Sequence, residues 1–193
     1  MPWLIIVLGY FLGSSPTAYI AGRVLKGVDI RGVGDGNMGA ANAFRQLGAK
    51  VGVAVGIIDA TKGAVAVLIA QAASLPLVAV LLTGTATVIG HNWPIFIGFR
   101  GGRGEATTIG VLLTLITQPM LIVGGVAISA IFFTRRVILG QGPFLFVPLP
   151  VVCWWLGVPG MLTAYGIALP CLVGFTHFLR TRRVVDTSGT EGA

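Results

Sequence analysis

The sequence predicts an all-α integral membrane protein of about seven transmembrane helices, with the N-terminus outside and the C-terminus in the cytoplasm. Apolar residues make up 55% of the 193 residues and charged residues only 10%, whereas a soluble domain carries roughly 25% charged residues. Apolar runs near the ~20 residues that cross a bilayer recur along the chain. Lys and Arg cluster in alternate connections between these runs. The net charge of +7 is therefore attributed to cytoplasmic loops, and no nucleic-acid binding is expected.

The apolar runs give the expected spans in chain order. A run from 106 to 133 is too long for one crossing and contains Gln118-Pro119, so it is divided into two short spans, because proline breaks or kinks a helix. The expected spans are residues 3–21, 51–73, 75 to 91 or 99, 106–117, 119–133, 144–156 and 160–178.

The charges order these spans across the membrane. Basic residues fall within 23–50, at 100 and 103, at 135 and 136, and from 180 to 183, whereas the connections 71–76, 117–119 and 157–160 carry none. Seven spans place every basic cluster on one side, and the positive-inside rule makes that side cytoplasmic. We expect one transmembrane domain over 1–180 and a short basic, flexible cytoplasmic tail over 181–193. Cys153 and Cys171 lie in apolar stretches and are expected to pack as small hydrophobic residues.

A Gly/Arg loop separates the third and fourth expected spans. Arg100, Gly101, Gly102, Arg103 and Gly104 follow one another there. Glycines let backbone N–H groups close around an anion, and arginine presents a forked set of donors to phosphate. Helical potential from residue 106 adds the N-terminus of a helix. The alternative is a flexible basic loop at the membrane surface.

A second polar segment, 34–45, joins the first two spans. It contains three glycines, two asparagines and Arg45 at close spacing. Such glycines permit unusual backbone angles, so a polar hairpin or re-entrant turn with a binding role is favoured over a plain connection.

Charged and titratable residues also occur within or at the ends of spans. Asp59 and Lys62 are three residues apart, share a helix face and are expected to pair. A functional pair and a structural pair that pins the span to a neighbouring loop are equally consistent with this spacing. His91 and His177 are expected at the cytoplasmic interface, either as phosphate-binding or proton-handling residues or as interfacial hydrogen-bonding groups. Two histidines do not make a metal site, and no metal or cofactor is expected.

The sequence contains no Ser-His-Asp, Cys-His or HExxH arrangement. Any chemistry is therefore expected to use substrates that are already activated. Glycine turns and arginines on one membrane face suit phosphorylated, partly lipidic substrates.

Four motifs in matching order resemble the bacterial acyl-phosphate:glycerol-3-phosphate acyltransferases, the PlsY family. They are residues 34–45, Asp59-x-x-Lys62-Gly63, Gly90-His91-x-x-Pro94-x-Phe96-x-x-Phe99 and Gly101-Gly102-Arg103-Gly104-x-Ala106-Thr107. The resemblance covers residues 13–177. It implies a seven-span protein of the bacterial inner membrane that moves an acyl group from acyl phosphate to the sn-1 hydroxyl of glycerol 3-phosphate. The products are lysophosphatidate and phosphate, and membrane lipids surround the protein. The sequence does not determine the oligomeric state, and a monomer is expected.

The resemblance also implies site residues. Arg45, Arg103 and His177 would hold glycerol phosphate, the turns at 36–42 and 101–107 would hold acyl phosphate, and Asp59 with Lys62 would brace the loops. The substrate assists the catalysis, so no enzyme nucleophile is implied. The full set of implied substrate-binding residues is Asp35, Gly36, Asn37, Gly39, Asn42, Arg45, His91, Arg100, Gly101, Gly102, Arg103, Gly104, Thr107, His177 and Arg180.

Several positions depart from the family pattern. The family usually has serine at Asp35, threonine at Ala41, lysine at Arg100 and Arg103, a small apolar residue at Glu105 and asparagine at Arg180, and 138–141 replaces a Ser-Leu-Ala-Ser stretch. An extra anion near bound phosphate is unfavourable, so we expect Asp35 and Arg180, which both depart, to form a salt bridge. Two alternatives stay open, namely a divergent paralogue with another acceptor or no activity, and a small anion transporter.

Overall fold

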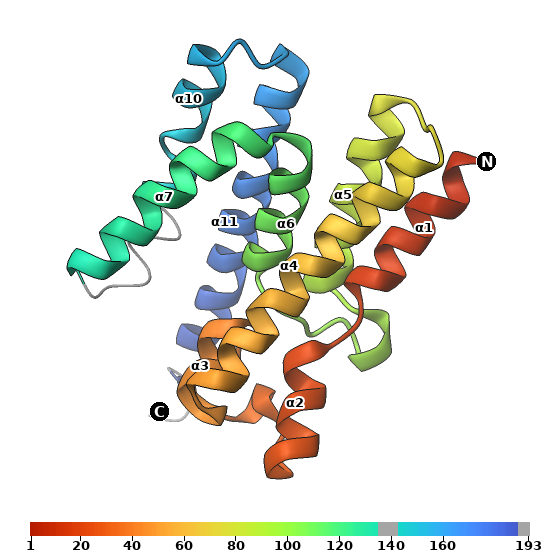
Figure 1. The fold of residues 1–193 in the computed structure, drawn as a ribbon. Coiled ribbons are helices and arrows are strands. Elements are labelled where there is room, and N and C mark those ends of the chain that lie inside the picture. Colours follow the sequence, from red (N-terminus) through yellow and green to blue (C-terminus); the bar gives the residue numbers. More distant parts are fainter. Residues whose placement is uncertain (135–142, 189–193) are drawn as a thin grey trace.

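The chain folds as a helical bundle (Figure 1), here in a computed structural model that describes residues 1–134 and 143–188. Those residues contain helices and no strands, which confirms the all-α class. In chain order the elements are α1 (Pro2–Gly13), α2 (Thr17–Lys26), η1 (Ile30–Gly32), α3 (Ala40–Leu47), α4 (Ala49–Ala72), α5 (Leu77–Asn92), η2 (Ile95–Ile97), α6 (Glu105–Leu115), α7 (Thr117–Thr134), α9 (Pro143–Phe146), α10 (Leu149–Trp155) and α11 (Gly160–Ser188).

Five segments within the described residues are long and apolar enough to cross a membrane. They are Pro2–Lys26, Ala49–Ala72, Leu77–Ile97, Thr117–Thr134 and Gly160–Arg180, and α6 is a shorter apolar helix. The second and third expected spans match α4 and α5 closely. The run from 106 to 133 is divided, as expected, although the break falls at Ile116, just before Gln118-Pro119.

The first expected span is not one continuous helix, which corrects the prediction. It is interrupted at Ser14–Pro16, between α1 and α2. Pro16 has no N–H to continue the helical hydrogen bonds. The carbonyl of Ser15, at this break, accepts hydrogen bonds from the Thr17 N–H at 3.1 Å and from Lys62 Nζ at 3.1 Å, so α4 is bound directly to the interruption.

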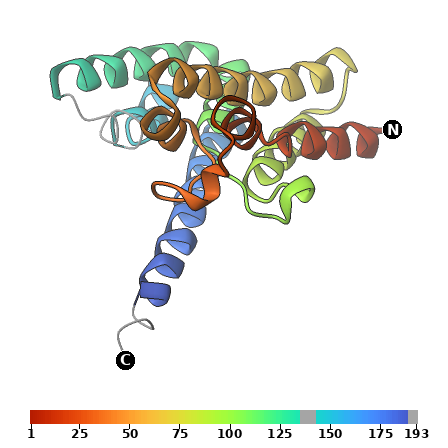
Figure 2. The same cartoon turned by 90° about the horizontal axis from the view of Figure 1, so that it is seen from below.

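The sixth expected span is also interrupted. The segment forms the short helices α9 and α10, which are separated at Val147 and Pro148. Proline disfavours helical geometry in the residue before it, which explains this break. In contrast, α11 continues to Ser188, past the expected end of the seventh span and into the expected tail, and its C-terminal part extends beyond the other helices (Figure 2). The doublet at 135–136, the stretch 138–141 and the end of the tail at 189–193 lie outside the described residues.

Glycines let the helices pack closely. A Cβ at Gly110 on α6 would lie 1.8 Å from the carbonyl oxygen of Ala60 on α4, and one at Gly63 would lie 2.3 Å from the Thr107 carbonyl oxygen. A Cβ at Gly13 would lie 1.9 Å from the Thr87 carbonyl oxygen, where α1 meets α5. The helices therefore touch through their backbones, as small residues allow in membrane proteins.

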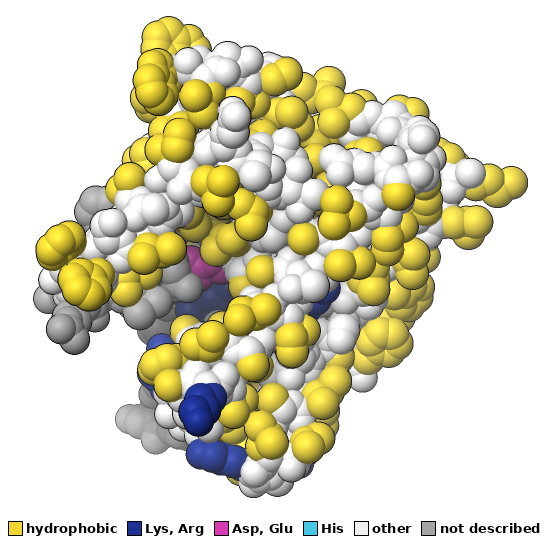
Figure 3. Space-filling view, viewed as in Figure 1, with side chains coloured by type: hydrophobic (Ala, Val, Ile, Leu, Met, Phe, Trp, Pro, Cys, Tyr) yellow, Lys and Arg dark blue, Asp and Glu magenta, His cyan; other side chains and the backbone are white. Residues whose placement is uncertain are grey.

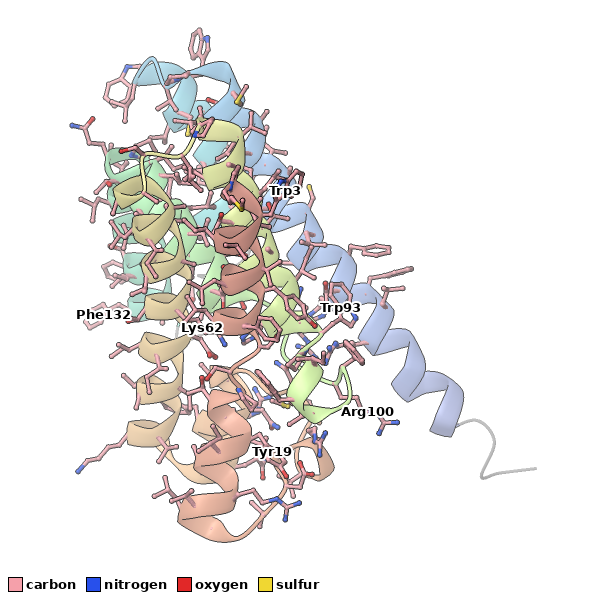
Figure 4. All side chains as sticks on the ribbon, turned by 90° about the vertical axis from the view of Figure 1, so that its right-hand side faces the viewer. Trp3, Tyr19, Lys62, Trp93, Arg100 and Phe132 are labelled. Atoms are coloured by element: carbon pink, nitrogen blue, oxygen red, sulfur yellow. The ribbon has the colours of Figure 1, made fainter. Side chains whose placement is uncertain are left out.

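The two ends of the bundle differ in character. Apolar side chains dominate the visible surface, whereas Lys and Arg gather around α2 and α3 (Figure 3). Trp3 lies toward one end, Tyr19 and Arg100 lie toward the other, and Lys62 lies between them (Figure 4). This asymmetry agrees with the grouping of basic residues that the sequence predicts for the cytoplasmic face.

Gly110→Ala is expected to destabilise the protein, because the new methyl group would overlap the α4 backbone. Overpacking of this kind typically costs about 1–3 kcal/mol, which lowers the melting temperature of a chain this size by several degrees. Gly124→Ala on α7 is the matched control, since its Cβ would meet nothing within 4 Å. Thermal unfolding of the detergent-purified variants measures both. Equal melting temperatures would contradict the close α4–α6 packing.

Candidate substrate-binding site

A pocket of about 660 Å³ lies where the two polar loops meet α11. One part of its wall is polar and the other is apolar, so the pocket is complementary to an amphiphilic ligand. The polar residues are Asp35, Asn37, Arg45, Asp59, His91, Arg103, Glu105 and His177, and the apolar ones include Phe146, Val147, Pro150, Ile167, Pro170 and Val173. In the space-filling view, acidic and basic side chains are visible in a hollow bordered by α3, α4 and α7 (Figure 3).

The first loop, residues 33–39, is shaped by its glycines and by Asn42. Gly34 and Gly36 have φ of +64° and +66°, which confirms that glycines here provide unusual backbone angles. The Nδ2 group of Asn42 donates to the carbonyls of Ile30, Val33 and Asn37. Asn42 is therefore a buried organiser of the loop and does not line the pocket.

Asn37 presents unused hydrogen-bonding capacity within this loop. It lines the pocket, and its Oδ1 atom is buried without a hydrogen-bond partner among the described residues. A buried acceptor of this kind is normally satisfied by water or ligand. Gly39 also lines the pocket, at the start of α3.

The Gly/Arg loop packs directly on the C-terminal end of α5. The N–H of Gly101 donates to the Asn92 carbonyl at 3.2 Å, and the N–H of Gly102 donates to the His91 carbonyl at 3.1 Å. A Cβ at Gly102 would lie 2.1 Å from His91 Nε2. The expected anion nest at Gly101 and Gly102 is therefore wrong: these two amides hold the loop on α5, and the glycines are needed because the approach is so close.

The last glycine of this loop begins α6. Gly104 has φ of +84° and precedes the first helical residue, Glu105, which confirms the expected helix start within one residue. Gly104, Glu105 and Ala106 all line the pocket. The first N–H groups of a helix have no partner within the helix, so this end of α6 offers donors and a favourable dipole to an anion.

A carboxylate bridges the two arginines of the pocket. Asp35 Oδ2 lies 2.9 Å from Arg45 Nη2 and 3.7 Å from Arg103 Nη2. Asp35 Oδ1 also accepts the backbone N–H of Asn37 at 3.2 Å. The Nε atom of Arg103 is buried and has no hydrogen-bond partner among the described residues, so Arg103 retains an unused donor.

The expected salt bridge between Asp35 and Arg180 is wrong. The guanidinium of Arg180 instead donates to the carbonyls of Gly101 and Asn92, the latter at 2.6 Å. Arg180 thus ties α11 to the end of α5 and to the Gly/Arg loop. Arg180 was included among the expected site residues only because of its position in the family motif. Its contact with Gly101, a residue 79 positions away, could not be deduced from sequence spacing.

The expected pair between Asp59 and Lys62 is confirmed. Lys62 Nζ lies 2.9 Å from Asp59 Oδ1, and Thr17 donates its hydroxyl to the same oxygen at 2.9 Å. His91 Nδ1 lies 3.7 Å from Asp59 Oδ1. Asp59 Oδ2 is buried without a hydrogen-bond partner among the described residues, and Asp59 lines the pocket. The pair therefore braces α2, α4 and α5 beside the site.

A second ionic cluster lies outside the pocket, before the first loop in the chain. Arg31 Nη2 lies 2.7 Å from Asp29 Oδ2, and Arg23 Nη2 lies 3.4 Å from it. The hydrogen bond from Arg31 lowers the pKa of the Asp29 carboxyl to about 2. Both arginines stack over the Tyr19 ring, and Arg31 also donates to the Ile97 carbonyl. This cluster joins α2, η1 and η2.

The structure brings together part of the expected set. Asp35, Asn37, Gly39, Arg45, Asp59, His91, Arg103, Gly104 and His177 line the pocket. The remainder, Gly36, Asn42, Lys62, Arg100, Gly101, Gly102, Thr107 and Arg180, lie outside its lining. Arg100 is exposed (Figure 4), whereas Thr107 is a buried residue of α6 at its contact with Gly63 of α4.

Sequence reasoning missed the apolar part of the lining on α9, α10 and α11. Those residues belong to spans that looked uniformly apolar, so nothing marked the ones that face a pocket. Among the side chains that the structure describes, no group of three His, Cys, Asp or Glu residues is placed to hold a metal ion.

Comparison with known proteins identifies the family. The glycerol-3-phosphate acyltransferase family model matches residues 3–187. Glycerol-3-phosphate acyltransferase 4 of Dehalococcoides mccartyi is 49% identical, covering 95% of this chain and 98% of that protein. The Halalkalibacterium halodurans glycerol-3-phosphate acyltransferase is 40% identical over 98% of this chain and 93% of that protein.

A solved structure shares the fold. The crystal structure of PlsY, an integral membrane glycerol 3-phosphate acyltransferase, in its glycerol 3-phosphate form superposes with a TM-score of 0.83 at 31% identity, covering 96% of this chain and 92% of that one. The family model, which matches residues 3–187, includes both polar loops and the helices that line the pocket. The chain therefore belongs to the glycerol-3-phosphate acyltransferase family.

Proposed function

We propose that the protein transfers a fatty acyl group from acyl phosphate to the sn-1 hydroxyl of glycerol 3-phosphate, giving lysophosphatidate and inorganic phosphate. The observation that carries this proposal is the two-part pocket. Arginines and the N-terminus of α6 form its polar part, and side chains of α9, α10 and α11 form its apolar part. An acyl phosphate has the same two-part character, and family membership supplies the acceptor.

The chemistry suits a site without a nucleophile. Acyl phosphate is a mixed anhydride, so the acceptor hydroxyl oxygen forms the new ester bond to the acyl carbon while the bond to phosphate breaks. The hydroxyl proton passes to a phosphate oxygen of the substrate, and inorganic phosphate leaves. The protein's contribution is to align the two substrates and to neutralise their charge.

We assign the two substrates to different groups of residues in the pocket. Arg45, Arg103 and His177 hold the glycerol phosphate, since all three line the polar part of the pocket. Asn37, Gly39 and the first N–H groups of α6 hold the acyl phosphate. The Gly/Arg loop is held in position by contacts with the end of α5, which come from the amides of Gly101 and Gly102 and from the Arg180 side chain.

The proposed setting is the bacterial inner membrane, with the pocket opening toward the cytoplasm and one chain forming a complete site. The gathering of Lys and Arg around α2 and α3 (Figure 3) supports this orientation. The polar groups of the pocket come mainly from loops and helix ends, which favours an interfacial acyltransferase over a transporter with a site at the bilayer midplane.

Purified protein is expected to release phosphate and to form labelled lysophosphatidate when given acyl phosphate and labelled glycerol 3-phosphate. Gly166→Leu tests the apolar part of the pocket, because Gly166 lines it and a Cβ there would make only ordinary contacts, at 3.5 Å to Ile116 Cδ1 and 3.6 Å to Leu149 Cδ2. A larger side chain should lower kcat/KM for a long-chain acyl phosphate more than for a short-chain one.

Gly124→Leu on α7 is the control for this variant, since that position is open and outside the pocket. Absence of both products from folded wild-type protein would refute the proposed reaction. An equal loss for long and short chains in Gly166→Leu would refute the assignment of the acyl chain.

Arg103→Ala is expected to lower kcat/KM by about a hundredfold or more, because it removes a partly buried cation and its donors from the phosphate site. Arg100→Ala is the control from the same loop: its side chain is exposed and outside the pocket lining, so activity should stay within about twofold. Steady-state kinetics measure both, and similar losses would show that only the charge of the loop matters.

The orientation can be tested by cysteine labelling in a variant lacking Cys153 and Cys171. Arg100→Cys should react with an impermeant maleimide only after the cytoplasmic face is exposed, because the basic end is proposed to lie inside. Ala73→Cys, exposed at the uncharged connection between α4 and α5, should react from outside in intact cells. The opposite labelling pattern would contradict the proposed orientation.

A further inference from the structure

We propose that the Asp35 carboxylate is a built-in competitor for substrate phosphate and so sets the affinity of the site for glycerol 3-phosphate. This inference rests on the proposed function, because it concerns the arginines to which that function assigns the phosphate. It makes Asp35 a residue that sets substrate affinity, although Asp35 itself does not bind the substrate.

The competition follows from the donors involved. Asp35 Oδ2 lies within ion-pair distance of both Arg45 and Arg103. All three side chains line one pocket. A phosphate that binds these arginines needs N–H groups that Asp35 already engages, and its negative charge is repelled by the carboxylate if Asp35 stays in place.

The carboxylate is held at this point by its own loop. Its Oδ1 atom accepts the Asn37 backbone N–H at 3.2 Å, as in an Asx turn. Asp35 therefore presents Oδ2 to the arginines in a fixed turn, and the turn itself needs only an acceptor oxygen. An asparagine at this position would keep that acceptor and lose only the charge.

The two arginines are engaged unequally. The distance from Asp35 to Arg45 is 2.9 Å and the distance to Arg103 is 3.7 Å. Arg103 also has a buried Nε donor without a partner among the described residues. Substrate phosphate therefore binds Arg103 first. Full binding also requires the ion pair between Asp35 and Arg45 to break.

The other charged groups of the pocket do not relieve the competition. Glu105 is a second carboxylate, and Asp59 is neutralised by Lys62 at 2.9 Å. Apart from the pair of Asp59 and Lys62, the pocket contains two positive charges, on the arginines, and two carboxylates, Asp35 and Glu105. His91 and His177 are the remaining titratable groups. Removing one carboxylate leaves a net positive charge for a phosphate dianion.

The test compares Asp35→Asn and Asp35→Ser with the wild-type protein. Asp29→Asn is the control, because Asp29 also pairs with two arginines but lies outside the pocket lining. Calorimetry of the detergent-purified full chain measures binding of glycerol 3-phosphate and of inorganic phosphate. Steady-state kinetics measure KM for each substrate, and melting temperatures monitor folding.

Both Asp35 variants are expected to bind glycerol 3-phosphate about three- to tenfold more tightly, with a matching fall in its KM, as expected for loss of a partly exposed ion pair and of one repulsive charge. Asp29→Asn should bind like the wild type. A purely structural role for Asp35 predicts the reverse, namely weaker binding together with a lower melting temperature.

Unchanged or weaker phosphate binding in either folded Asp35 variant would overturn the inference, as would an equal gain in Asp29→Asn. The binding measurements need no turnover, so the two proposals can fail separately. Tighter phosphate binding in variants of a protein that transfers no acyl group would support the competitor role and refute the proposed reaction. Normal turnover together with unchanged phosphate binding in the variants would support the proposed reaction and refute the competitor role.

Discussion

The buried pair of Asp59 and Lys62 is the interaction on which the arrangement of the bundle depends. An unpaired charge among packed membrane helices is strongly unfavourable, so each of these groups must keep its partners. Lys62 reaches both Asp59 and the Ser15 carbonyl, and Asp59 accepts the Thr17 hydroxyl. The break between α1 and α2 is thereby held against the middle of α4. Because His91 approaches the same carboxylate, this contact also fixes the end of α5 beside the pocket.

The end of α5 in turn serves as the platform for the Gly/Arg loop. Gly101 and Gly102 bind its last carbonyls through their amides, and Arg180 reaches the same region from α11. These contacts use backbone groups of the loop, so the side chain of Arg103 is left to line the pocket. A loop held in this way can present its arginine and the first turn of α6 in one orientation, which reduces the reorganisation needed when substrate binds.

Much of the fold could be predicted because apolar length and charge placement are local properties of the sequence. They located α4, α5 and the division between α6 and α7, and spacing alone predicted the pair of Asp59 and Lys62. The helix breaks at Pro16 and Pro148 were missed because an apolar run conceals them, and α3 was hidden in a polar stretch. The site was harder to predict. Glycines that permit close packing and glycines that bind anions look alike in sequence, and the partner of Asp35 depended on which of several distant arginines the fold brings near.

The position of Asp35 suggests why a carboxylate can be tolerated in a phosphate site. Two arginines facing one pocket repel each other and, without an anion, tend to separate or to order water around them. Asp35 bridges Arg45 on α3 and Arg103 beside α6, so it joins the two polar loops when no substrate is present. A neutral residue would leave the arginines more available but less well positioned. The same carboxylate therefore organises the empty site and weakens the binding of the phosphate that replaces it. Because the contacts to α5 already fix the Gly/Arg loop, removing the competing charge outweighs the loss of the bridge.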